Sequence, residues 1–139
     1  MRASQRSGQK GVMLIEALIA ILLFSAGILA MIGMQGIAIS YSADAKYRSD
    51  AAFLANELIG QMWVDRLQFP NYAYPGGTAP NLATWKAKVD AALPGTAANA
   101  PTVAVDAVTG TVTVTIRWQA PTADSARSYR SVAIIQANP

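Results

Sequence analysis

One carboxylate stands inside the longest apolar stretch of this 139-residue chain. Glu16 lies four residues after Val12, in a run from Val12 to Met34 that contains no other charged side chain. A charged side chain within a membrane helix costs about 2.5–3.5 kcal/mol at the bilayer centre, and less near the bilayer surface. A simple anchor has no reason to keep that cost, so we expect Glu16 to have a partner.

Other groups able to do chemistry are scarce. The chain has no cysteine and no histidine, which removes disulfides, thiolate metal sites and the commonest general base. Asp90, Asp106 and Asp124 are isolated acids in predicted helix or turn positions. The Pro-Gly-Gly at 75–77 indicates a turn, because a phosphate-binding loop would follow a strand. We therefore expect no enzyme activity, no metal and no cofactor.

The positive charge is concentrated at one end. Three basic residues, Arg2, Arg6 and Lys10, precede the apolar run, and the eight that remain balance the eight acidic residues. A neutral domain gives no electrostatic reason to bind nucleic acid.

The apolar run is long enough to cross a membrane. Its 23 residues would form about 35 Å of helix, against a hydrocarbon core of about 30 Å. The basic residues before it predict a cytoplasmic amino end and, in a bacterium, a periplasmic carboxyl part anchored in the inner membrane.

A cleaved secretory signal is the competing interpretation. Ala38-Ile39-Ser40 loosely fits a small-x-small cleavage site. However, the apolar run exceeds the usual 7–15 residues of such signals and contains a glutamate, so we favour the membrane helix.

Gly11-Val-Met-Leu-Ile-Glu16, with its basic leader and following apolar run, resembles the class III signal of type IV pilins and type II secretion pseudopilins. The resemblance implies that a prepilin peptidase removes residues 1–11 on the cytoplasmic side. The cut would fall between Gly11 and Val12, and Val12 would then be methylated at its new amino terminus. Glu16, the fifth residue after the cut, would act in subunit assembly. One departure is Val12 itself, where this family usually has phenylalanine.

Such a cut would place two opposite charges close together. The Val12 amine and the Glu16 carboxylate would lie about one helical turn apart. If subunits stack with an axial offset, Glu16 of one subunit meets the Val12 amine of the next, and each charge offsets the desolvation of the other. Alternatively, Glu16 extends toward the lipid headgroups and has no partner.

The helix is predicted to continue beyond the membrane, to about Arg66. No proline interrupts residues 12–68, and Pro70 supplies a stop. The second half is amphipathic. Its predicted apolar face comprises Tyr41, Ala45, Ala51, Leu54, Ala55, Leu58, Ile59 and Met62.

The rest of the chain predicts a small α+β domain. Residues 68–80 form a loop, after which Asn81 caps a short helix that buries Trp85 and ends at Pro94-Gly95. Strands are expected at 102–105, 111–118 and 128–136, with a hairpin turn at 106–110. In the second strand the alternate residues Val112, Val114, Ile116 and Trp118 share one face.

The predicted fold is therefore α+β, with a long amino-terminal helix packed on a small antiparallel three-stranded sheet, an arrangement that this pilin family shows. The corresponding parts are a leader at 1–11, a transmembrane or filament-core helix at 12–34, and the helix continuation with a periplasmic domain at 35–139.

Three further segments are similar to PilV-type minor pilins: residues 27–35, residues 52–59 and Val114-Thr-Ile-Arg-Trp118. The resemblance implies a minor pilin that helps to initiate a type IV pilus and is incorporated at or near its tip, outside the cell. Its partners would be the other minor pilins, the major pilin, the prepilin peptidase and the inner-membrane assembly platform. The closest alternative is a minor pseudopilin of type II secretion.

Two other interpretations stay open. Tyr72 and Tyr74 suggest an adhesive pilus-tip module, because exposed aromatic residues often anchor recognition; we favour packing of their loop onto the helix. A plain membrane-tethered domain would give Glu16 no role in assembly.

Overall fold

The computed structural model describes residues 9–121 and 123–135. Contacts between residues divide the chain into two units, with the division after Ser42. We describe each unit by itself. Most of the predicted leader, residues 1–8, and the predicted end of the last strand, Gln136, lie outside the described residues.

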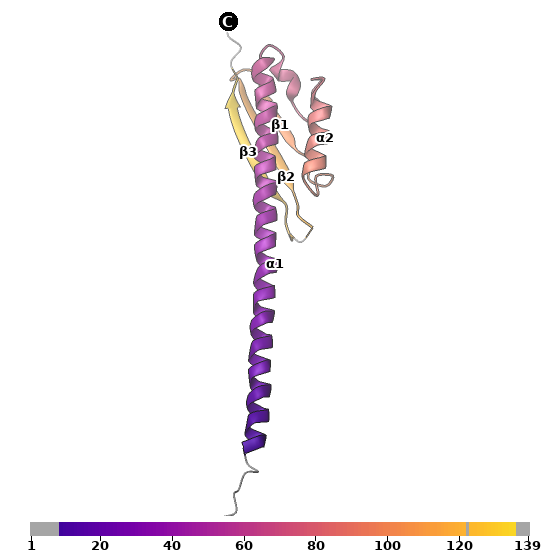
Figure 1. Ribbon diagram of the computed structural model, residues 1–139. Coiled ribbons are helices and arrows are strands. Elements are labelled where there is room, and N and C mark those ends of the chain that lie inside the picture. Colours follow the sequence, from indigo (N-terminus) through magenta and orange to yellow (C-terminus); the bar gives the residue numbers. More distant parts are fainter. Residues whose placement is uncertain (1–8, 122, 136–139) are drawn as a thin grey trace, which may run out of the picture. The chain divides into compact units, whose positions relative to one another are not determined.

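The long helix is confirmed. Helix α1 runs from Gln9 to Val64, so it contributes to both units (Figure 1). It ends two residues before the predicted position because the chain turns there: the Gln68 N–H donates to the carbonyl oxygen of Asp65 at 3.0 Å. That turn brings Phe69 into the core.

The second unit contains the predicted sheet. Strands β1 (Thr102–Asp106), β2 (Thr111–Trp118) and β3 (Arg127–Ile134) form an antiparallel sheet in the order β1-β2-β3. Strand β2 has the predicted bounds, and β1 is one residue longer than predicted. Strand β3 begins one residue earlier and ends at Ile134, so Ile135, which was predicted to be in the strand, lies just beyond it. Together with α1, this gives the α+β, pilin-like arrangement that the sequence predicted.

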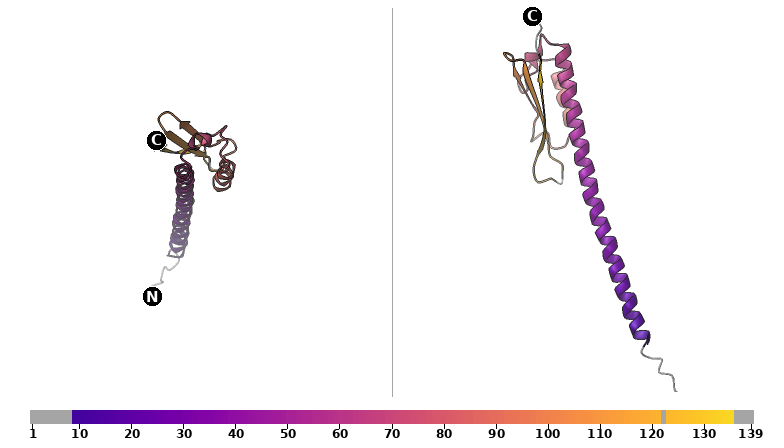
Figure 2. Two further views of the ribbon diagram at one scale, coloured as in Figure 1. Left: turned by 90° about the horizontal axis from the view of Figure 1, so that it is seen from above. Right: turned by 90° about the vertical axis from the view of Figure 1, so that its left-hand side faces the viewer.

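One face of the sheet packs on the carboxyl half of α1. The right-hand view of Figure 2 shows the strands as a layer beside that part of the helix. The predicted alternation in β2 is confirmed, because Val112, Val114, Ile116 and Trp118 are all buried. The apolar face of α1 is confirmed only from Ala51 to Met62. Tyr41 and Ala45, also predicted there, are exposed, because the sheet and α2 cover only the later turns.

Helix α2, Leu82–Ala92, packs beside α1 in the same core. Trp85 is buried, as predicted, and its indole N–H donates to the backbone carbonyl of Leu54 in α1 at 2.9 Å. The prediction that the Asn81 side chain caps this helix is wrong. Asn81 occupies the capping position, but its backbone is helical (φ −89°, ψ −6°) rather than extended, and its side chain points to other partners.

The loop before α2 is ordered by its aromatic residues. A short 3-10 helix, η1 (Phe69–Tyr72), buries both of its end residues. Tyr72 is only 2% exposed, so it packs the loop against the domain and cannot serve as an exposed anchor. Half-buried Tyr74 forms an isolated bridge with Val103 of β1.

The hairpin turn between β1 and β2 is held by Asp106. Its carboxylate accepts hydrogen bonds from the Thr109 hydroxyl at 2.7 Å and from the Val108 N–H at 2.9 Å. Gly110 completes the turn with φ +71°, a backbone conformation that favours glycine. The bond from the Thr109 hydroxyl, followed by those from the backbone N–H groups of Val108 and Thr109, lowers the pKa of Asp106 below its usual 3.8.

A lowered folded-state pKa means that ionised Asp106 stabilises the fold above about pH 4 and that this contribution is lost as the pH falls through the folded value. We predict that Asp106→Asn lowers the thermal unfolding midpoint at pH 7, and that its difference from wild type shrinks below pH 4. Asp124→Asn, a change at an exposed acid before β3, is the control. A difference for Asp106→Asn that stays constant with pH would contradict this role.

Candidate functional site

The predicted processing and assembly residues lie in the first turns of α1. Gly11, Val12 and Glu16 are all exposed, and the helix is continuous through the Gly11–Val12 bond. Since four residues are about one helical turn, Val12 and Glu16 lie on the same side of the helix. Among the described side chains, no ion pair or hydrogen bond to Glu16 is present.

The apolar run around Glu16 is exposed among the described residues. Between Val12 and Ile39, every large apolar side chain is 44–71% exposed. A soluble monomer rarely exposes so large a continuous apolar surface. This helix is long and apolar enough to cross a membrane. Its exposed apolar surface is compatible with a membrane-spanning helix.

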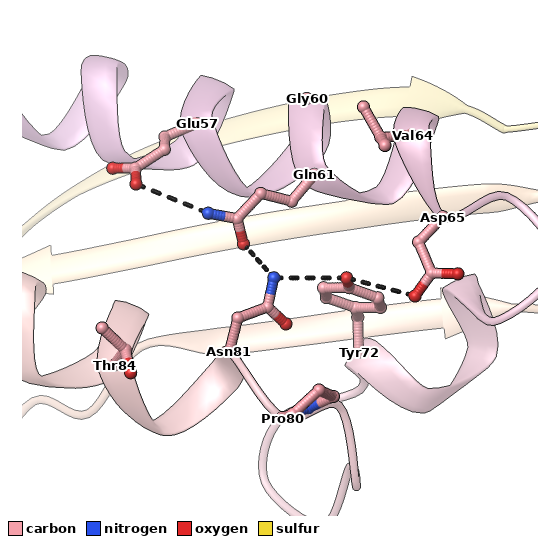
Figure 3. A pocket seen from close by; sticks show the side chains of 9 residues that line it. All are labelled: Glu57, Gly60, Gln61, Val64, Asp65, Tyr72, Pro80, Asn81 and Thr84. Carbon is pink, nitrogen blue, oxygen red and sulfur yellow. Dashed lines mark hydrogen bonds between the residues drawn. The ribbon is translucent and has the colours of Figure 1, made fainter.

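A cleft between α1 and α2 is a second place where polar groups gather (Figure 3). It is open and has a volume of about 780 Å³. It is lined by Glu57, Gly60, Gln61, Val64, Asp65, Tyr72, Pro80, Asn81 and Thr84.

A chain of hydrogen bonds runs along this cleft between two carboxylates. Asn81 Nδ2 donates to Gln61 Oε1 at 2.6 Å, and Gln61 Nε2 donates to Glu57 Oε1 at 3.4 Å. In the other direction, Asn81 Nδ2 also lies 3.3 Å from the Tyr72 hydroxyl, which is 3.5 Å from Asp65 Oδ2. Figure 3 shows these side chains pointing toward one another. Asn81 thus links α1 to the loop and to α2.

Two further features define the cleft. Glu57 pairs with Lys88 of α2, which ties the two helices together at one end. Asn81 Oδ1 is buried and has no hydrogen-bond partner in the described part of the chain. The carboxylates, amides and phenol that line the cleft form hydrogen bonds that hold α1, the loop and α2 together.

The isolated acids of the sequence are distributed over the second unit. Asp90 pairs with Lys86 one turn earlier in α2, and that hydrogen bond lowers the pKa of Asp90 below its usual value. Asp106 holds the hairpin, and Asp124 lies in the connection before β3. In residues 9–121 and 123–135, no three acidic side chains come together as a possible metal site.

The roles of Gly11, Val12 and Glu16 stay predictions from the sequence, whereas the cleft was not predicted. The contacts of Asn81 join residues from three separate segments, and no local pattern indicates them. The only signal was the pair of tyrosines in a loop rich in proline and glycine, which indicated packing of the loop on the helix.

No protein-family model, curated protein or solved structure matches this chain.

The cleft yields a test of its structural role. Asn81→Asp removes the amide donor and places a carboxylate between Gln61 and Tyr72, near Glu57 and Asp65. We predict a loss of about 1–3 kcal/mol in the free energy of unfolding at pH 7, measured by urea unfolding of the chain in detergent. Asn56→Asp, an equivalent change on the exposed face of α1, should stay within about 0.5 kcal/mol. Equal stability of the two variants would contradict the assignment.

Proposed function

We propose that this chain is a minor pilin of a type IV pilus, processed by a prepilin peptidase and assembled through α1. The observation that carries the proposal is the pair Val12 and Glu16. The two residues lie one turn apart on the amino half of α1, where every large apolar side chain from Val12 to Ile39 is exposed. Such a helix needs a surrounding apolar phase, and within it a carboxylate needs a positive partner.

Processing supplies that positive charge. Cleavage between Gly11 and Val12 converts a peptide nitrogen into an amine at the start of the apolar helix. Within one subunit this amine lies a turn away from Glu16; between two subunits with an axial offset, the amine of one can contact the carboxylate of the other. The apolar face can pack in many registers, but the buried charges pair in only one, so the pair sets the register of assembly.

The second unit fits a subunit role. Its core is built from the carboxyl half of α1, α2 and one face of the sheet. The hydrogen bonds of its cleft join α1, the loop and α2. In this account the domain lies in the periplasm before assembly and outside the cell afterwards. The other minor pilins, the major pilin, the peptidase and the inner-membrane platform are its partners, and incorporation is at or near the tip.

Replacing Glu16 tests the proposal. Glu16→Ala leaves the amine of the neighbouring subunit buried without a counter-charge, a loss of about 3–5 kcal/mol. We predict that its amount in sheared pili falls about a hundredfold or more relative to wild type. Its amount in the membrane fraction should be unchanged.

Ser25→Ala is the matched control, because Ser25 is an exposed polar residue in the same apolar run. This variant should enter pili as the wild type does. Incorporation of Glu16→Ala at the wild-type level would contradict the proposal and indicate a plain membrane-tethered domain.

A deletion strain separates the pilus from the secretion system. Without this chain, cells should have few or no pili and should secrete proteins normally. Normal piliation with a secretion defect would overturn the pilus assignment and identify a minor pseudopilin instead.

A further inference from the structure

The register of the sheet determines which backbone groups of β3 point outward. The Ile135 N–H donates to the Gly110 carbonyl at 2.7 Å, one step beyond the last β2–β3 pair. In an antiparallel ladder, residues that bond across the pair alternate with residues that do not. The odd-numbered residues of β3 therefore bond to β2. The residues whose backbone N–H and C=O groups point away from β2 are Ser128, Arg130, Val132 and Ile134.

The opposite edge of the sheet is covered. Val103 of β1 exchanges two backbone hydrogen bonds with Tyr74, both 2.9 Å long. The segment after η1 thus occupies the outer side of β1. Another strand could pair there only by displacing Tyr74.

The β3 edge has no such cover. Within the described residues, no backbone hydrogen bond reaches the outer side of β3. Figure 1 shows this strand at the side of the sheet away from β1. Val132 and Ile134 are 55% and 57% exposed. The strand carries two arginines, Arg127 and Arg130, but no proline and no bulge, two features by which many edge strands avoid pairing.

A pocket lies at the amino end of β3. It has a volume of about 450 Å³, and its lining includes Asp44, Arg48, Trp118 and Arg127. Arg127 pairs with Asp44 at 3.0 Å, whereas Arg48 has no ion-pair partner among the described side chains. The indole N–H of Trp118 has no hydrogen-bond partner in the described chain, although Trp118 is only 2% exposed. Near this end of β3, the Arg48 guanidinium and the buried Trp118 indole N–H are therefore two donors without a partner among the described residues.

We propose that β3 accepts an antiparallel strand from a partner protein, one with apolar side chains opposite Val132 and Ile134 and a carboxylate opposite Arg127. The outward backbone groups would hold the strand by main-chain hydrogen bonds. The apolar residues of the partner strand would cover the exposed side chains of Val132 and Ile134. At its carboxyl end, the acid would reach the pocket lined by Arg48, which has no ion-pair partner among the described side chains.

A second copy of this chain fits the edge less well. Its β1 edge is blocked by Tyr74. Because outward-pointing residues must face one another, the longest antiparallel pairing of two β3 strands would set Ser128 opposite Ile134 and Arg130 opposite Val132. In addition, β3 contains no acid that could enter the pocket. The observations therefore favour a different protein, and the inference does not depend on the proposed pilus function.

Amide hydrogen exchange can test the pairing directly. The full chain would be labelled with ¹⁵N in detergent micelles and mixed with the peptide acetyl-Val-Thr-Val-Thr-Val-Thr-Thr-Glu-amide. We expect exchange at Arg130, Val132 and Ile134 to slow at least tenfold, because their N–H groups become bonded. Exchange at Ser131 and Ala133, whose N–H groups already bond to β2, should change less than twofold.

Two variants at one position separate binding from folding. Val132→Pro removes an outward N–H and leaves the bonds to β2 intact, so it should weaken peptide binding about tenfold or more. Val132→Thr keeps that N–H and should bind within about threefold of wild type. Retained β2 and β3 amide signals would show that both variants are folded.

The pocket is tested with the same peptide. Arg48→Gln in the protein, or glutamine in place of the peptide's glutamate, should each weaken binding about fivefold. Absence of protection, equal protection of odd and even residues, or unaltered binding by Val132→Pro would overturn the proposal. Slowed exchange at Arg130, Val132 and Ile134 in the absence of peptide, caused by dimerisation of the chain through β3, would also overturn the proposal. None of these outcomes depends on pilus assembly.

Discussion

A carboxylate on an uncovered apolar helix is the constraint on which the rest of this structure depends. The large apolar side chains from Val12 to Ile39 are exposed to solvent among the described residues, as is compatible with a helix that lies in lipid or among other helices. In either environment Glu16 carries a desolvation cost that only a nearby positive group offsets. In the proposed function, the amine created at Val12 would be such a group, and the partner of Glu16 would belong to a neighbouring chain.

The same helix meets two different physical demands along its length. Its first half is apolar on all sides, as is typical of a helix surrounded by lipid or protein. From Ala51 to Met62 it buries only one face, against the sheet and α2. The carboxyl half therefore forms the core of a small domain, while the amino half leaves its contacts to other molecules. The two edges of the sheet differ in a similar way. Tyr74 pairs with Val103 on the outer side of β1, whereas the outer side of β3 is open.

Local sequence patterns predicted the helices and strands. They could not predict contacts between segments that are distant in the sequence. The alternation from Val112 to Trp118 identifies a strand with one buried face because side-chain direction repeats every two residues. Trp85 was predicted as core from helical spacing in the same way. By contrast, Asn81 looked like a helix cap, and its bond to Gln61 depends on how α1 and α2 meet. The Tyr74 bridge likewise joins a loop to a strand that follows much later. Glu16 was identified from its chemistry alone, since its proposed partner belongs to another chain.

The most direct test of the central claim is the intact mass of the protein from cells with and without the prepilin peptidase. The account predicts that residues 1–11 are lost and one methyl group is gained, only when the peptidase is present. That result would establish the new amine one turn from Glu16. An unprocessed chain in both strains, or one cut near Ser40, would contradict the account and indicate an ordinary anchored or exported domain.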